Sequence, residues 1–187
     1  MIPDVLEHRL AEHCAPTLLG AKAASLLSLS REEFPELPEA LRRYNRTLYR
    51  TGLRFLILRE TSQRSLILVF RPALLRSRLN TAGAKALLQR FDDPETDCLG
   101  VLLRRLKKRF TPGGDFPHEI GLFLDYPPED VEAFIAGSSE CKLCGYWKVY
   151  GDVDGARERF ACYDACRLCL CRMLAAGNTI SQLLQTA

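Results

Sequence analysis

Six of the eight cysteines in this 187-residue chain lie between Cys141 and Cys171. Cys141 and Cys144 form a C-x-x-C-G turn, and the other four follow on a predicted helix of residues 154–176. A helix turns by roughly 100° per residue, so three of the four share one face and the last lies opposite. The three on one face are Cys162, Cys166 and Cys169, with Cys171 opposite. A turn with two thiols that faces a helix with three could make a soft-metal site.

Zinc needs four thiolate or imidazole ligands in a tetrahedron, and the CxxC turn supplies two. The second pair would be Cys162 with Cys166, or Cys166 with Cys169. The 17 residues between Cys144 and Cys162 fit zinc-ribbon spacing of about 15 to 20, although a ribbon's second pair normally lies in another turn. Four thiolates could equally hold an iron–sulfur cluster. Zinc or an iron–sulfur cluster is therefore the expected cofactor, on Cys141, Cys144, Cys162, Cys166 and Cys169. The alternative is no cofactor, with the helical cysteines as small apolar residues on a buried face.

A second group of reactive residue types comprises His13, Cys14, Lys22, His118 and Glu119. Cys14 precedes a predicted helix, whose amide dipoles would lower the thiol pKa and favour thiolate. His118 would then be the base, and Lys22 would hold an anionic substrate. The same residues could serve a thiol-redox or metal site. The alternative is structural: Cys14 fills a helix junction, Glu119 caps its own helix, and His118 hydrogen-bonds a backbone group.

A cluster of basic residues lies on a predicted helix that ends at Phe110. Its members are Arg104, Arg105, Lys107, Lys108 and Arg109. Such a face is commonly solvated and favourable at a helix C-terminus, but it could also dock an acidic partner protein. Docking of that kind would weaken with salt, and a salt-insensitive complex would contradict it. No aromatic residues alternate with the basic ones and the net charge is only +3, so no nucleic-acid partner is expected.

The pattern of apolar residues predicts an α+β fold, a single domain over residues 1–187. A three-stranded antiparallel sheet (about 53–60, 65–71 and 146–150) is expected to pack with about nine helices. The predicted parts are N-terminal helices over 3–50, a hairpin over 53–71, a helical middle over 73–136, and the CxxC loop, strand and cysteine-rich helix over 141–176. Within the first part, one helix is expected over 16–29. Trp147 and Tyr150 would pack under the cysteine helix rather than stack on a flavin or haem.

The composition bounds the class of protein. Hydrophobic residues make up 47% of the chain, enough for a packed core. No apolar run approaches the roughly 18 residues of a membrane span and no signal peptide is evident, so a soluble cytoplasmic protein without a membrane partner is expected. In a reducing cytosol its cysteines would be free thiols, metal ligands or redox groups. The sequence has no phosphate-binding glycine loop.

Several segments together resemble one family. They are His13–Leu18 with Lys22, Phe116–Leu124, Tyr126-Pro127, Asp130-Val131 and Gly145–Tyr150. The chain resembles the uncharacterised bacterial family catalogued as domain of unknown function 3793, found mainly in anaerobic Firmicutes. The resemblance implies a host of that kind and no activity. Asp125 departs from the family pattern, in which glycine is expected.

These observations favour a metal-binding or thiol-redox accessory protein of anaerobic bacteria. One alternative is a small enzyme with Cys14 as nucleophile and His118 as base. The other is a metal-free interaction module that docks an acidic partner through the Arg104–Arg109 helix. The sequence does not indicate an oligomeric state.

Overall fold

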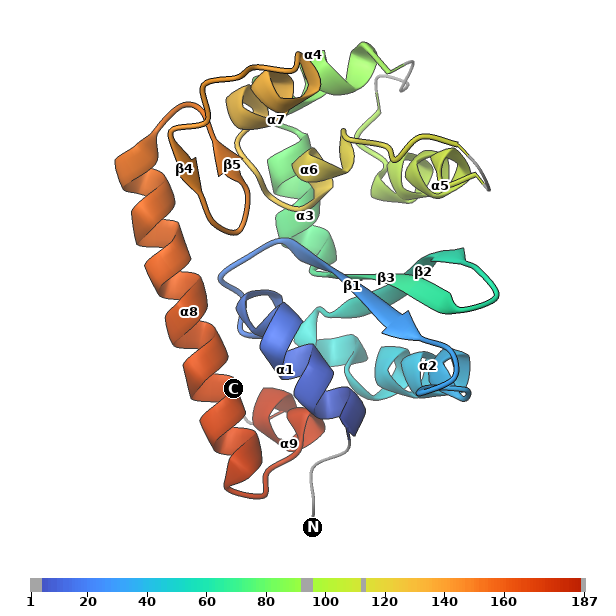
Figure 1. The fold of residues 1–187 in the computed structure, drawn as a ribbon. Helices are drawn as coiled ribbons and strands as arrows, with labels where there is room; N and C mark the ends of the chain where they lie inside the picture. The colour runs from blue at the N-terminus through green and yellow to red at the C-terminus, as the bar shows by residue number, and fades with distance from the viewer. Residues whose placement is uncertain (1–4, 92–95, 112–113, 186–187) are drawn as a thin grey trace. The chain divides into compact units, whose positions relative to one another are not determined.

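The structure is a computed structural model that describes residues 5–91, 96–111 and 114–185. Within these ranges the chain forms nine α-helices, one short 3₁₀ helix, a three-stranded antiparallel sheet and a two-stranded hairpin (Figure 1). The α+β class is therefore confirmed. The contacts divide the chain into two compact units. Unit 1 is Met1–Pro72 with Tyr163–Ala187, and unit 2 is Ala73–Cys162. A single domain stays a prediction.

Unit 1 is built on the three-stranded sheet. Its strands are β1 (Ala24–Ser30), β2 (Arg54–Glu60) and β3 (Arg64–Phe70), in the order β1-β3-β2. The helices are α1 (Val5–Leu18), α2 (Leu37–Thr47), α9 (Ile180–Gln185) and the second part of α8 (Val153–Ala175), with the 3₁₀ helix η1 at Tyr49–Thr51. The predicted hairpin over 53–71 is confirmed as β2 and β3, with a bulge between Ile57 and Arg59.

The predicted helix over 16–29 is wrong. Helix α1 continues through Pro16 and ends at Leu18, and Gly20 then turns the chain with φ +87°. Residues 24–30 form β1, the third strand of the sheet, paired with β3. Short apolar runs of this kind fit either a buried helix or a strand, and only pairing with β3 decides between them. The predicted start of the first helix at residue 3 lies outside the described residues.

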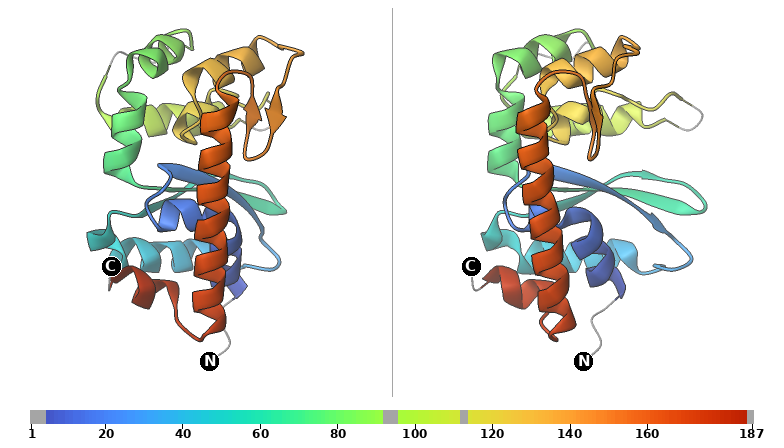
Figure 2. Two further views of the ribbon diagram at one scale, coloured as in Figure 1. Left: turned by 90° about the vertical axis from the view of Figure 1, so that its left-hand side faces the viewer. Right: turned by 60° about the vertical axis from the view of Figure 1, so that its left-hand side comes forward.

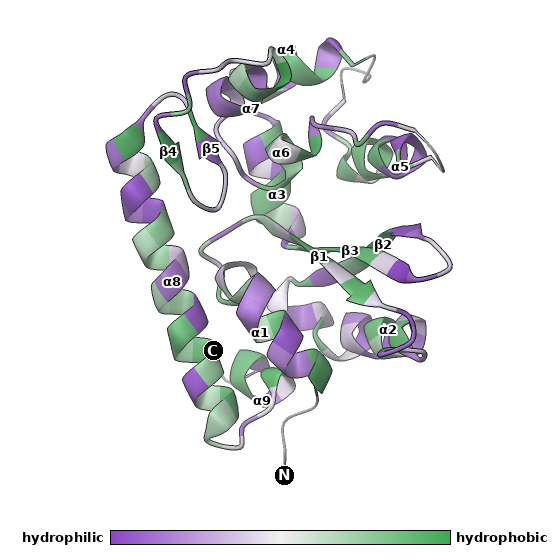
Figure 3. Ribbon diagram, viewed as in Figure 1, coloured by the Kyte–Doolittle hydropathy of each residue, from purple (hydrophilic) through white to green (hydrophobic). Residues whose placement is uncertain are grey.

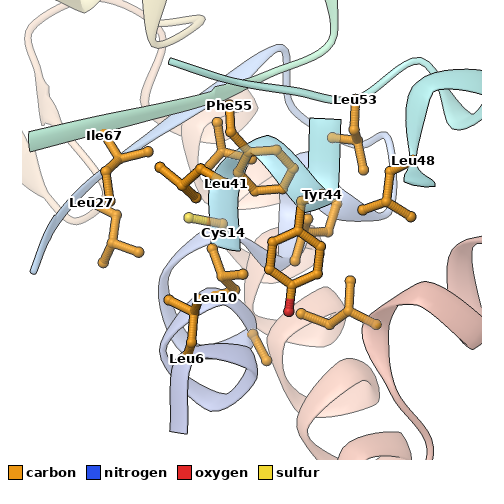
Figure 4. Close-up of a cluster of buried hydrophobic side chains, with 14 of the residues drawn as sticks. Leu6, Leu10, Cys14, Leu27, Leu41, Tyr44, Leu48, Leu53, Phe55 and Ile67 are labelled. Atoms are coloured by element: carbon orange, nitrogen blue, oxygen red, sulfur yellow. The ribbon is translucent and has the colours of Figure 1, made fainter. Parts of the chain in front are cut away.

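The core of unit 1 lies between α1, α2 and one face of the sheet (Figure 4). Its fully buried members include Leu10, Cys14 and Ile67. One polar link crosses this core: the Glu7 carboxylate accepts hydrogen bonds from the Tyr44 hydroxyl at 3.2 Å and from the Ile180 backbone N–H at 3.2 Å. Helices α1, α2 and α9 are thereby joined through a single buried carboxylate.

Unit 2 is mostly helical. Its elements are α3 (Pro72–Leu79), α4 (Ala82–Gln89), α5 (Leu99–Arg109), α6 (Ile120–Phe123), α7 (Pro128–Ile135), the hairpin β4 (Leu143–Cys144) and β5 (Lys148–Val149), and the first part of α8. The predicted strand at 146–150 is present only as β5. It pairs with β4 and does not belong to the three-stranded sheet, whose third strand is β1, paired with β3.

Helix α8 contributes residues to both units as one uninterrupted helix (Figure 2). Its bounds agree with the predicted 154–176 to within one residue. Among the described residues, no helix combines the length and apolarity that crossing a membrane requires.

Asp125 has φ 64°, a left-handed backbone conformation that glycine adopts without steric cost. This explains why glycine is the residue expected here from the family resemblance. The aspartate tolerates the conformation better than most side chains. It also forms an ion pair of 2.8 Å with the Arg78 guanidinium, and its own side chain is 8% exposed.

Candidate functional site

The hairpin β4–β5 brings two thiols together. The Sγ atoms of Cys141 and Cys144 lie 3.8 Å apart. Backbone hydrogen bonds close the hairpin, from Lys142 N–H to the Val149 carbonyl at 2.9 Å and from Gly145 N–H to the Trp147 carbonyl at 3.1 Å. Because both ends of the turn are tied by the backbone, the spacing of the thiols is set locally.

Gly145 explains how this hairpin packs. A Cβ atom at this position would meet the Phe160 ring of α8 at 2.2 Å, closer than real Cβ contacts allow. The ring of Phe160 also lies 4.6 Å from the Trp147 ring, edge to face. The hairpin therefore packs against the face of α8 that carries Phe160. Only glycine at position 145 leaves room for this contact.

The two thiols of the hairpin form a hydrogen bond with each other. The hydrogen bond with Cys141 raises the pKa of the exposed Cys144 thiol, as do slight desolvation and the neighbouring Cys141 charge, while the Lys148 ammonium lowers it. Lys148 is the cross-strand partner of Cys144. A thiol with a raised pKa is a poor free nucleophile, and a metal ion that binds the pair would have to displace the protons of both thiols.

Cys162, the one helical cysteine in the same unit as the hairpin, does not face it. Cys162 follows Phe160 by two residues, which places it roughly 160° away around α8 from the side that touches the hairpin. Among the described residues, no three His, Cys, Asp or Glu side chains gather as a metal ion would require. Metal binding by Cys162, Cys166 and Cys169 stays a prediction.

The alternative, in which the helical cysteines lie on a buried face, is wrong for two of these residues. Cys162 and Cys169 are exposed, and Cys166 is partly buried. The buried stripe of α8 consists instead of Ala156, Tyr163, Leu170 and Leu174. The thiols lie beside this stripe because the helix rotation is set by its larger apolar side chains.

Cys14 is a core residue and not a helix-start thiol. It lies inside α1 with no exposed surface. Burial raises its pKa to about 12, against the smaller lowering effect of the Lys22 ammonium. The lowered pKa expected from the sequence is wrong, because α1 runs unbroken through Cys14 and Pro16, so that the thiol lies inside a helix and not before its first turn. Lys22 is itself only 5% exposed and lies over the Tyr163 ring, 5.6 Å from its centroid.

The buried thiol of Cys14 is expected to make stability fall at high pH. Its pKa rises from the ordinary 9.0 to about 12, so the unfolded chain loses this proton first as the pH increases. The contribution of the protonated thiol to the free energy of unfolding is complete below about pH 9. It declines by about 1.4 kcal/mol per pH unit toward about pH 12. Urea unfolding of wild type and Cys14→Ala, at about pH 8 and about pH 10.5, isolates the effect. The difference in the free energy of unfolding between wild type and Cys14→Ala should shrink at the higher pH. A difference that is the same at both pH values would contradict the raised pKa of Cys14.

His118 and Glu119 belong to unit 2, whereas Cys14 and Lys22 belong to unit 1. Glu119 is 3% exposed and forms an ion pair of 2.8 Å with Arg109, and its side chain does not cap α6. The predicted capping role is therefore wrong. His118 is exposed, with its ring edge-on to Phe134 at 5.2 Å.

The basic helix is confirmed as α5, with its leucines buried and hydrophilic residues around its other side (Figure 3). Arg104, Lys107 and Lys108 are exposed. Arg109 instead contacts other parts of unit 2: its guanidinium forms an ion pair with Glu119 and donates a hydrogen bond to the Phe91 carbonyl. An acidic partner for α5 stays a prediction.

Unit 2 contains a pocket that sequence reasoning missed. Its volume is about 380 Å³, and its walls come from the segment before α6, from α6 and α7, and from the hairpin. The aromatic and polar lining consists mainly of Phe116, His118, Tyr126, Phe134, Trp147 and Lys148. Most of these residues lie in the segments that carry the family resemblance. These separate segments of family resemblance were the one feature of the sequence that could have indicated the pocket.

Asp130 holds the inner wall of this pocket together. One carboxylate oxygen accepts from the Trp147 indole N–H at 2.8 Å. The other accepts from the backbone N–H groups of Tyr150 at 2.7 Å and Gly151 at 2.8 Å. Trp147 is 7% exposed, stacks on Tyr126 at 5.3 Å and meets Phe160 of α8 edge to face at 4.6 Å, so the predicted packing against the cysteine helix is confirmed for Trp147. The carboxylate therefore orients the indole and fixes the end of the hairpin.

Comparison with known proteins identifies one family. The family model described as "Protein of unknown function (DUF3793)" matches residues 10–184. No curated protein and no solved structure matches the chain. The match spans both compact units and includes the pocket and the dithiol hairpin. The chain therefore belongs to the DUF3793 family of proteins of unknown function.

Proposed function

We propose that the protein binds a tetrahedral soft metal ion, zinc in the first instance, through the Cys141 and Cys144 thiolates. The supporting observation is the 3.8 Å separation of the two Sγ atoms. Two sulfurs that each lie about 2.3 Å from one tetrahedral zinc ion are about 3.8 Å apart. The thiols thus already have the spacing of two corners of a ZnS₄ tetrahedron.

Such a site is half complete. Among the residues described here, no third ligand joins the pair, so two coordination positions are left for water or for ligands of another molecule. Cys144 is exposed and Cys141 partly so, which leaves the metal accessible. Closed four-ligand sites serve structure, whereas sites with open positions exchange ligands. An accessory role in which the metal is handed to or received from a partner follows from this accessibility.

Zinc titration of the reduced protein against a chromophoric chelator tests the proposal. Cys141→Ser and Cys144→Ser should each weaken binding by about 100-fold or more, because one thiolate alone cannot hold the ion. Cys98→Ser, which removes an exposed thiol elsewhere, is the matched control and should bind as wild type does. Cadmium provides a second readout through its thiolate charge-transfer absorption.

Thermal unfolding separates a ligand role from a structural one. Without metal, Cys144→Ser should be about as stable as wild type, because its side chain is exposed. With zinc in excess, only the wild type and the control should gain stability. Zinc binding that survives in both hairpin variants, or that is lost in Cys162→Ser or Cys169→Ser instead, would overturn the assignment.

A further inference from the structure

We infer that the pocket of unit 2 binds a small planar aromatic carboxylate, with its ring against the aromatic lining and its carboxylate at Lys148. The volume of about 380 Å³ lies in the range of small-molecule sites, which span roughly 300 to 1,000 Å³. This inference does not depend on the metal site.

The lining explains the preference for an aromatic ring. Phe116 is 46% exposed and Phe134 is 41% exposed, an unusual amount of free surface for two phenylalanines on one pocket. The His118 ring lies between them, 6.0 Å from Phe116 and 5.2 Å from Phe134. A flat ring would cover these surfaces and make the edge and face contacts that aromatic groups favour.

The inner wall is rigid and offers little polar chemistry. Both oxygens of Asp130 already accept hydrogen bonds, so its carboxylate is not available to a ligand cation. Burial raises the pKa of Tyr126, which keeps its hydroxyl protonated. Trp147 is held in place by Asp130 and by stacking on Tyr126. The deep part of the pocket therefore selects for an apolar group.

The Lys148 ammonium at the rim of the pocket favours a ligand with a negative charge. The Lys148 ammonium lies 5.6 Å from the Phe134 ring centroid, and its residue is exposed. His118 adds an N–H donor on the same aromatic wall. A carboxylate attached to the ring would meet this ammonium in a charge-assisted hydrogen bond.

Three probes test the inference on protein kept free of metal with a chelator. They are 2-naphthoate, 2-naphthylmethanol, which keeps the ring without the charge, and decanoate, which keeps the charge without the ring. The only tryptophan of the chain, Trp147, lies in the pocket wall, so its fluorescence reports occupancy directly. Calorimetry supplies the affinity. Naphthoate should bind at least about tenfold more tightly than either of the other probes.

Lys148→Gln should weaken naphthoate binding by about tenfold and leave naphthylmethanol unchanged. Lys142→Gln, on the same hairpin but outside the pocket lining, is the matched control and should change neither. Phe116→Ala should weaken both ring probes. The inference is overturned if decanoate binds as tightly as naphthoate, if Lys148→Gln has no effect, or if no probe binds. Because metal is absent, none of these outcomes bears on the zinc proposal.

Discussion

Replacing Asp130 by alanine is expected to destabilise unit 2 by about 3 kcal/mol, because three donors lose a charged acceptor at once. The carboxylate is 3% exposed and bonds the Trp147 indole and two backbone N–H groups. A buried indole N–H left without a partner is costly by itself. The stability of Asp130→Asn should lie between those of wild type and Asp130→Ala. Its single amide oxygen can accept either from the indole or from the two backbone N–H groups, but not from both.

Tryptophan fluorescence during urea unfolding measures this effect, because the single tryptophan is a direct partner of Asp130. Glu129→Ala is the matched control. It removes an exposed carboxylate from the same first turn of α7 and should change stability by less than about 0.5 kcal/mol. Equal urea midpoints for Glu129→Ala and Asp130→Ala would show that the three hydrogen bonds contribute little to stability.

Replacing Arg71 by methionine is expected to destabilise unit 1 by about 2 to 3 kcal/mol. The guanidinium donates to the carbonyls of Thr17 at 2.7 Å, Leu18 at 2.5 Å and Thr51 at 2.9 Å. The first two carbonyls end α1, where the helix dipole favours a cation. Partial burial lowers the pKa of Arg71, and the three carbonyl contacts favour its charged form.

Arg71→Lys tests the geometry separately from the charge. A single ammonium cannot reproduce a planar fork that reaches three carbonyls, so the lysine variant should recover less than half of the lost stability. Circular dichroism at the helix band during chemical unfolding gives the free energies. Arg50→Met, which removes an exposed cation from η1, should behave as wild type does. A lysine variant as stable as wild type would mean that charge alone matters.

The elements that the sequence predicted well are those with a strong local period. The hairpin of β2 and β3, the amphipathic α5 and the long α8 all formed within a few residues of the expected bounds. The segment 16–29 failed because its serines and leucines fit either a helix or a strand. Its pairing partner, β3, lies about 40 residues further along the chain, beyond the reach of any local pattern.

The sequence by itself determined the class of fold, the family and the spacing of Cys141 and Cys144, because a C-x-x-C-G turn is closed by its own backbone. Only the tertiary structure decided the rest. The burial of Ala156, Tyr163, Leu170 and Leu174 set the rotation of α8, and with it the exposure of Cys162 and Cys169. Core packing around α1 buried Cys14 and raised its pKa. Asp130 acquired its role, and the pocket its walls, from contacts between segments far apart in the chain, which no local periodicity encodes.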